Sequence, residues 1–286
     1  MSRLYNRSVA LTISKVTKGR FFAVTESVTV RDLRVTFSIA KSLESTPNTA
    51  TVNVYNLAER TRAEFQQRPL QVRLEAGYAD GGLATLFVGD VRFARSSLGG
   101  VDWVTRLELG DGARARKHAR VSRSFKAGTT MRTVLDELAK SMGLTAPKST
   151  DEISALGAQV ANGIALSGPS HAELTRVLKA SGLGWSIQDH QLQVLPRGGA
   201  LASTAIVFSE HTGMVGVPEF GAPEQGGKPP TLAISKLIDP SALPTPGRKI
   251  VVSSRAVNGT FRVTRVTHHG DTHGAEWRSD VEAVAA

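Results

Sequence analysis

Apolar and polar residues alternate in short runs along the first part of the chain. A period of two is typical of half-buried antiparallel strands. Turn-forming sequences such as Pro47-Asn48 and Asp80-Gly81-Gly82 separate the runs, and a short helix is predicted over Ala58 to Phe65. Because closure hides strand edges, the pattern favours a closed or nearly closed barrel. The alternating runs are Val9 to Ile13, Leu33 to Ile39, Val52 to Val54, Leu70 to Leu74, Leu86 to Val88 and Trp103 to Leu109.

The spacing of apolar residues becomes helical after Lys126. It predicts a helix from Met131 to Met142, capped by the preceding Gly-Thr-Thr130 and ended by Gly143. A second helix is predicted from Ser170 to Gly182, with Ser170 and Glu173 as a capping box.

A β-hairpin is expected after the second helix, with its turn near Asp189-His190. A weaker strand is predicted over Ile164 to Leu166, between the two helices. These elements together indicate a small α/β unit.

Strand patterns return after residue 200. Asn258-Gly259 is a strong hairpin-turn signal, and Gly221 to Pro230 is predicted to be a long loop. The whole chain is therefore predicted to be mainly β with a small α+β domain: two β-barrel domains, residues 1–116 and 201–286, flanking an α/β insert over residues 117–200. The expected C-terminal strands are Ala205 to Ser209, Thr231 to Ile238, Lys249 to Ser253, Gly259 to Val266 and Glu276 to Val284.

Length and composition agree with this division. A chain of 286 residues has room for two or three cores. It contains no cysteine, which excludes disulfides, thiolate metal sites and cysteine nucleophiles. Neither the apolar core of a signal peptide nor a run of roughly 20 apolar residues is present, so we expect a soluble protein made in the cytoplasm, without a membrane span.

Positive charge is concentrated in the N-terminal half. Residues 1–150 carry 24 Lys and Arg against 13 Asp and Glu, whereas residues 151–286 carry 11 against 12. The densest basic run is predicted to contact a protein partner or to face the outer surface. A solvated connector and a nucleic-acid-binding module are the alternatives, although stacking aromatics and a helix-turn-helix pattern are missing. The candidate residues are Arg114, Arg116, Lys117, Arg120, Arg123 and Lys126.

The most chemical-looking cluster is His268, His269, Asp271 and His273. It could supply nitrogen and oxygen ligands to a metal, or serve a cell-wall hydrolase. A polar turn containing Gly270 and Gly274 explains the same residues. Because the Gly-x-Ser-x-Gly, P-loop and dinucleotide-binding patterns are absent, we predict no enzyme activity, no metal and no cofactor.

Three segments resemble the baseplate or tail hub family of tailed bacteriophages, which also includes the hub half of type VI secretion spikes. The resemblance covers nearly the full chain, and the order and spacing of the segments carry it. The segments are Asp32 to Ile39 with Ser45 to Leu57; the helix and hairpin from Leu174 to Leu195; and Thr212 to Trp277, with its Leu237-Ile-Asp-Pro240, Pro246-Gly-Arg248 and His268-x-Gly-Asp271 elements.

This resemblance implies a structural hub in the virion tail baseplate, assembled in the cytoplasm of the host bacterium. A homotrimer would form a pseudo-six-fold ring that joins a hexameric tail tube or another baseplate protein to a separate trimeric spike protein. DNA would pass through the channel during genome ejection without specific binding. No fused spike or lysozyme domain is recognisable in the sequence.

Overall fold

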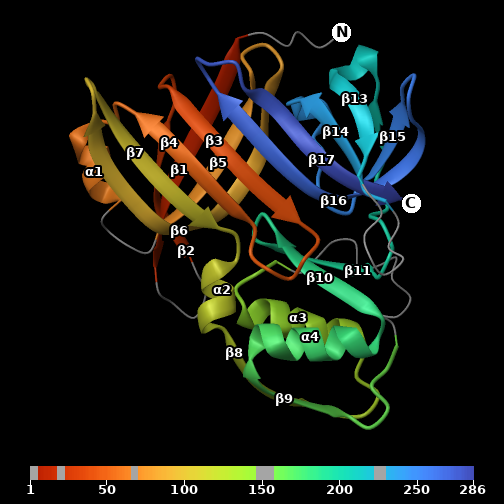
Figure 1. The fold of residues 1–286 in the computed structure, drawn as a ribbon. Coiled ribbons are helices and arrows are strands. Elements are labelled where there is room, and N and C mark those ends of the chain that lie inside the picture. Colours follow the sequence, from red (N-terminus) through yellow and green to blue (C-terminus); the bar gives the residue numbers. More distant parts are fainter. Residues whose placement is uncertain (1–5, 18–22, 66–69, 146–157, 222–229) are drawn as a thin grey trace.

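The computed structural model describes residues 6–17, 23–65, 70–145, 158–221 and 230–286. The molecule is mainly β, with 55% strand and 16% helix, as predicted. Within the described residues, 13 strands form one sheet in the order β13-β14-β17-β16-β3-β4-β7-β6-β5-β1-β2, with β15 also pairing with β16 and β12 with β15 (Figure 1).

The first seven strands form the N-terminal part of this sheet, together with one short helix. Adjacent strands in this part pair antiparallel. The elements are β1 (Arg7–Thr17), β2 (Ala23–Val30), β3 (Val35–Ser42), β4 (Thr49–Tyr55), α1 (Glu59–Glu64), β5 (Leu70–Tyr78), β6 (Gly82–Gly99) and β7 (Asp102–Gly110).

The C-terminal part continues the same sheet, because β16 pairs antiparallel with β3 from Arg265 opposite Ser42 to Asp271 opposite Thr36. Its elements are β12 (Ile206–Phe208), the 3₁₀ turn η3 (Glu210–Thr212), β13 (Met214–Phe220), β14 (Leu232–Leu237), η4 (Pro240–Ala242), β15 (Lys249–Ser253), β16 (Asn258–Asp271) and β17 (Trp277–Ala285).

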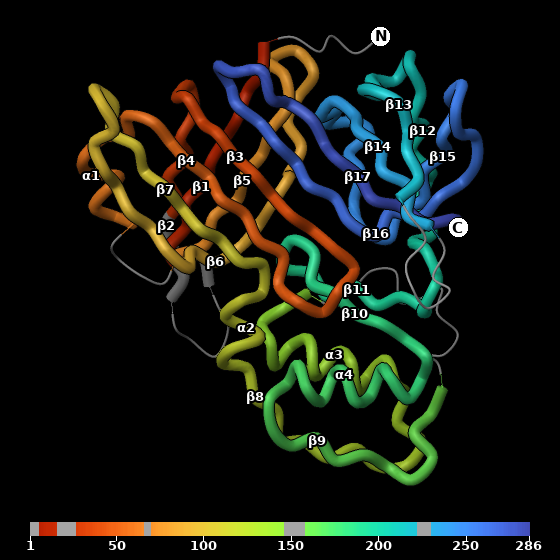
Figure 2. The backbone as a smooth tube through the Cα atoms, viewed as in Figure 1, coloured from red at the N-terminus to blue at the C-terminus, as the bar shows by residue number. Residues whose placement is uncertain are grey.

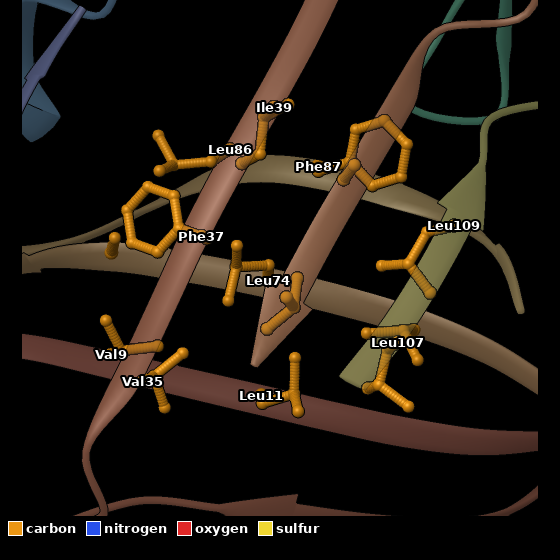
Figure 3. Close-up of a cluster of buried hydrophobic side chains, with 14 of the residues drawn as sticks. Val9, Leu11, Val35, Phe37, Ile39, Leu74, Leu86, Phe87, Leu107 and Leu109 are labelled. Carbon is orange, nitrogen blue, oxygen red and sulfur yellow. The ribbon is translucent and has the colours of Figure 1, made fainter. Parts of the chain in front are cut away.

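The prediction of two closed barrels is not confirmed. No sheet is closed within the described residues, and β2 and β13 lie at the two ends of the strand order. Instead, each part of the sheet curves around its own apolar core. Figure 3 shows the N-terminal core, where inward residues of facing strands such as Leu11, Phe37 and Leu107 point toward one another.

The two parts share one packing residue. Trp277 begins β17 and is 2% exposed, but it belongs to the N-terminal core. Its ring meets Phe37 at 5.7 Å and Tyr78 at 6.2 Å, both in edge-to-face geometry. The Arg7 guanidinium lies 5.4 Å from the centre of the Trp277 ring.

The domain boundaries predicted between residues 116 and 117 and between residues 200 and 201 remain predictions.

The α/β unit lies below the large sheet in the view of Figures 1 and 2. Its helices α3 and α4 pack with the β10–β11 hairpin around a separate apolar core. The two-stranded β8–β9 ladder borders it, from Arg120 opposite Pro169 to Phe125 opposite Ile164. The elements are α2 (Ala113–His118), β8 (Arg120–Phe125), α3 (Met131–Ser141), β9 (Ile164–Pro169), α4 (Ser170–Ala180), β10 (Leu183–Gln188) and β11 (Gln191–Pro196).

Of the two predicted helix caps, one is confirmed and one is wrong. Thr130 caps α3 by accepting the Thr133 N–H at 3.3 Å, as predicted. The capping box at Ser170 is wrong: α4 has no side-chain cap, and buried Ser170 instead accepts a hydrogen bond from the Ser141 hydroxyl at 2.8 Å.

The turn predicted at Asn258-Gly259 is also wrong. Ser253 already pairs with Asn258, so the turn comprises residues 254–257, where the Ser254 side chain accepts the Val257 N–H at 2.9 Å. Most of the loop predicted over Gly221 to Pro230 lies outside the described residues.

Candidate interface: a basic groove beside the junction of sheet and α/β unit

The β10–β11 turn is hydrogen-bonded to the residue that follows β7. Asp189 and His190 have φ values of 53° and 66°, the left-handed geometry of a tight two-residue hairpin turn. Their backbone N–H groups donate to the two carboxylate oxygens of Asp111, at 2.6 and 2.9 Å. Asp111 follows β7 and is completely buried. This one carboxylate therefore fixes the tip of the hairpin, because a buried carboxylate must find donors.

A second buried charge holds the same turn from β3. Lys41 is 2% exposed, and its Nζ donates to both carboxylate oxygens of Asp189 at 2.7 Å. The Val88 N–H donates to Asp189 Oδ1 at 3.1 Å. Burial raises the pKa of Asp189, and the neighbouring Lys41 ammonium opposes that shift. Lys41 and Asp189 therefore form a largely buried ion pair, in which the Lys41 side chain is 1% exposed and the Asp189 side chain 28% exposed.

Asn48 completes the junction. Its Oδ1 accepts the Ser42 N–H at 2.9 Å, and its Nδ2 donates to the Ile187 carbonyl at 2.8 Å. Gln188 returns a hydrogen bond from Nε2 to the Ser42 carbonyl at 2.7 Å. Since these bonds join the β3–β4 loop to β10, the α/β unit is held against the sheet by buried polar contacts as well as by packing.

A groove of about 640 Å³ opens beside this junction. Three segments form its walls: β6 at Asp90 to Arg92, the helix α2, and the β3–β4 loop at Pro47. Asp90 is 6% exposed and accepts two bonds from Arg114, at 3.2 Å from its backbone N–H and at 3.1 Å from its guanidinium. Asp90 and Arg114 therefore form a largely buried ion pair in the wall of the groove.

The basic run is divided by the fold. Arg114, Arg116 and Lys117 lie on α2 and line the groove, and Arg116 donates to the Ser45 carbonyl. The other three predicted residues lie outside the groove. Arg120 and Arg123 are exposed on β8, where Arg123 meets Glu137 at 3.2 Å, and Lys126 is exposed just after the strand.

Arg92 is a groove residue that sequence reasoning did not include among the candidates. It occupies a β-bulge, because Val91 pairs with Leu109 while Phe93 pairs with Glu108. A bulge changes the direction of the side chain. The Arg92 stem crosses Gly110, where an added Cβ would come within 2.8 Å of Arg92 Cδ. Two features of the sequence point to this bulge. Gly110 and Gly112 lie close together, and apolar and polar residues do not alternate regularly in the strand that contains Arg92.

Exposed apolar side chains gather at two other places. The edge strand β13 presents Val215, Val217 and Phe220, with exposed fractions of 43%, 67% and 52%. The β6–β7 hairpin presents Leu98 and Val101 near its tip. Such clusters on a soluble surface mark contact sites for other chains.

The histidine cluster does not assemble into a metal site. His268 is completely buried, and its Nδ1 lies 2.8 Å from the Ser279 hydroxyl. The Asp271 carboxylate is instead held by Arg34 at 2.8 and 3.3 Å and by the His273 N–H at 2.9 Å. In the part of the chain that the structure describes, no three His, Cys, Asp or Glu side chains are grouped to hold a metal ion. The predicted polar turn is found only after Asp271, at residues 272–275, whereas His268 and His269 lie within β16.

None of the helices in the described ranges has the length and apolar character that a membrane crossing requires.

Solved structures with this fold are tail proteins and spike-related proteins. A 43 kDa tail protein of prophage MuSo2 from Shewanella oneidensis has a TM-score of 0.68 at 10% identity, covering 98% of this chain and 97% of that one. A tail protein from Neisseria meningitidis has a TM-score of 0.67 at 11% identity, with the same coverage. The Escherichia coli c3393 protein, a type VI secretion component, has a TM-score of 0.60 at 11% identity, covering 89% and 74%.

These likenesses define the class: the fold is that of phage tail and type VI spike proteins. The chain belongs to the baseplate hub gp41 family, which it matches over residues 8–280. It is therefore a structural tail hub protein and a component of the phage virion tail, which confirms the family predicted from its sequence. Among curated protein sequences, none matches the chain.

Proposed function

We propose that three copies of this hub protein form a ring with pseudo-six-fold symmetry, which joins a hexameric tail tube or another baseplate protein to a separate trimeric spike. Each chain contributes two curved sheet regions with separate apolar cores. Three chains therefore contribute six such regions, which lets one face match a six-fold tube while the assembly keeps three-fold symmetry.

The observation that carries the proposal is the open sheet with two unlike ends. β13 ends the sheet on one side with exposed Val217 and Phe220, and β2 ends it on the other with exposed Val28. Unpaired edges with apolar side chains favour pairing with another chain. If β13 of one copy meets β2 of the next, the contact is heterologous, and three such contacts close a ring.

The proposed role is mechanical. The ring aligns the tail tube with the spike and involves neither catalysis nor a cofactor. DNA crosses its channel without specific binding. Assembly takes place in the cytoplasm of the host bacterium. The curved sheet and the polar turn at Asp271 support this role, because the side chains of that turn stabilise the fold.

Light scattering coupled to size-exclusion chromatography tests the ring. The purified chain is expected to elute at three times its monomer mass and to appear as rings by electron microscopy. Val217→Asp should yield monomers, because it places a charge in the apolar contact. Ala58→Asp is the matched control: it adds the same charge at an exposed position before α1, on neither edge strand, and should leave the trimer intact. A wild-type chain that stays monomeric at micromolar concentration, with and without its tail partners, contradicts the proposal.

A further inference from the structure

We infer that the groove between α2, the β6 bulge and the β3–β4 loop binds an acidic, extended segment of a partner protein. Its described lining carries four guanidinium or ammonium groups, those of Arg92, Arg114, Arg116 and Lys117, against the single carboxylate of Asp90. Its volume of about 640 Å³ lies within the range of ligand-binding clefts. The inference extends the tail role and does not depend on ring formation.

Two of the three groove arginines are held in place by the fold before any ligand binds. Arg114 is held by Asp90 at 3.1 Å, and Arg116 by the Ser45 carbonyl. Arg92 is exposed, and its stem lies close to Gly110, where an added Cβ would come within 2.8 Å of Arg92 Cδ. Side chains fixed before binding lose little rotamer entropy when a ligand arrives. In the remainder of the basic run, Arg120 and Lys126 are exposed on or beside β8 and lie outside the groove.

The chemistry of the walls favours a peptide over a nucleic acid. Pro47, Val91 and Ala113 supply small apolar contacts between the cations. The described lining contains no Phe, Tyr or Trp on which a base could stack, and its one aromatic ring is the His118 imidazole. An extended peptide with alternating carboxylates and small apolar residues satisfies both kinds of wall, because arginine binds carboxylates in a bidentate manner.

Fluorescence anisotropy with the purified full-length chain tests this assignment. The probe is a short fluorescein-labelled peptide of alternating Asp and Ala, compared with a Lys and Ala peptide of equal length and with labelled single- and double-stranded DNA. We expect salt-sensitive binding of the acidic peptide alone. Arg92→Gln and Lys117→Gln should each weaken it about tenfold, as expected for loss of a charge-assisted hydrogen bond.

Arg120→Gln and Lys126→Gln are the matched controls, because they remove charge from the same run outside the groove. They should leave the affinity within about twofold, since exposed, more distant charges are screened. Lys117 is exposed, so Lys117→Gln reports on binding even if Arg92→Gln alters folding, which thermal unfolding would reveal.

Three outcomes overturn the inference: no binding of the acidic peptide at low salt, equal loss of affinity in the control variants, or tighter binding of DNA that Arg120→Gln weakens as much as Lys117→Gln. The last outcome would support the nucleic-acid alternative. Because the assay is run separately on monomer and oligomer fractions, a failure of the ring proposal remains distinguishable from a failure at the groove.

Discussion

At the scale of single residues, His268 illustrates how a chemical-looking side chain serves the fold. Its ring is fully buried between β3 and β17, with Nδ1 bound to Ser279 and Nε2 without a hydrogen-bond partner. Burial, reinforced by the nearby Lys41 ammonium and His269, lowers its pKa from 6.5 to about 3. The histidine is therefore neutral in the folded chain at pH 7.

This burial predicts a specific loss of stability in acid. As the pH falls below about 6.5, the unfolded chain takes up a proton at His268 before the folded chain does, so stability is fully present above that pH and falls progressively toward pH 3. At pH 5 the loss is about 2 kcal/mol. His268→Gln keeps a polar partner for Ser279 and should reduce the difference in unfolding free energy between pH 7 and pH 5 by about that amount.

Urea unfolding at the two pH values measures the effect. The control is Ser279→Ala, which removes the hydroxyl beside His268 but keeps the buried histidine, and should retain most of the wild-type pH dependence. Identical pH dependence in wild type and His268→Gln would show that the buried histidine does not carry this linkage.

Gly270 marks a close approach where β16 crosses Phe37. An added Cβ would lie 2.2 Å from the Phe37 ring, which itself packs against Trp277. Gly270→Ala is therefore expected to destabilise the chain by about 1–3 kcal/mol through overpacking. Gly99→Ala provides the control, because its nearest contact would be an ordinary 3.7 Å to Val104. Chemical denaturation measures both, and equal stability of the two variants would contradict the packing argument.

At the scale of elements, the β10–β11 hairpin depends on charges contributed by distant strands. Lys41→Met leaves the Asp189 carboxylate without its cation and should cost about 3 kcal/mol, whereas the double variant with Asp189→Asn should recover part of that loss. Hydrogen exchange is expected to rise first in β10 and β11, because their turn loses the Lys41 ion pair and keeps the hydrogen bonds to Asp111. Arg106→Met breaks an exposed pair with Glu108 and should cost under about 1 kcal/mol. Comparable losses in both single variants would refute the junction as a buried ion pair.

The elements that the sequence predicted correctly are those with a strong local signal. β3 alternates between buried and less buried positions along its whole length, β7 does so from Val104 to Leu109, and α3 carries both its cap and its apolar stripe. β8 was not predicted, because Val121 is its only buried residue and the strand therefore has no alternating apolar pattern. β13 escaped prediction because it contains Gly216 and Pro218 and pairs irregularly with β14.

The candidate site was only half predictable for a similar reason. Charge density pointed to Arg114, Arg116 and Lys117, but the groove also requires Arg92, which a bulge re-aims toward α2. The anchor Asp111 receives its donors from residues 78 and 79 positions away. Local patterns carry no record of such pairings, because they arise only when the α/β unit docks on the sheet.

At the scale of the whole molecule, the absence of cysteine makes ring closure directly testable. Val217→Cys on β13 and Thr29→Cys on β2 place one thiol on each free edge. If β13 of one copy meets β2 of the next, oxidation should link neighbouring copies, since a disulfide requires Cα atoms within about 7 Å. Non-reducing electrophoresis should then show dimers and trimers and nothing larger, because three heterologous contacts close on themselves. Each single-cysteine variant is the control and should form no ladder. A ladder that continues beyond three would indicate an open filament, and no crosslinking in a proven trimer would show that other surfaces build the ring.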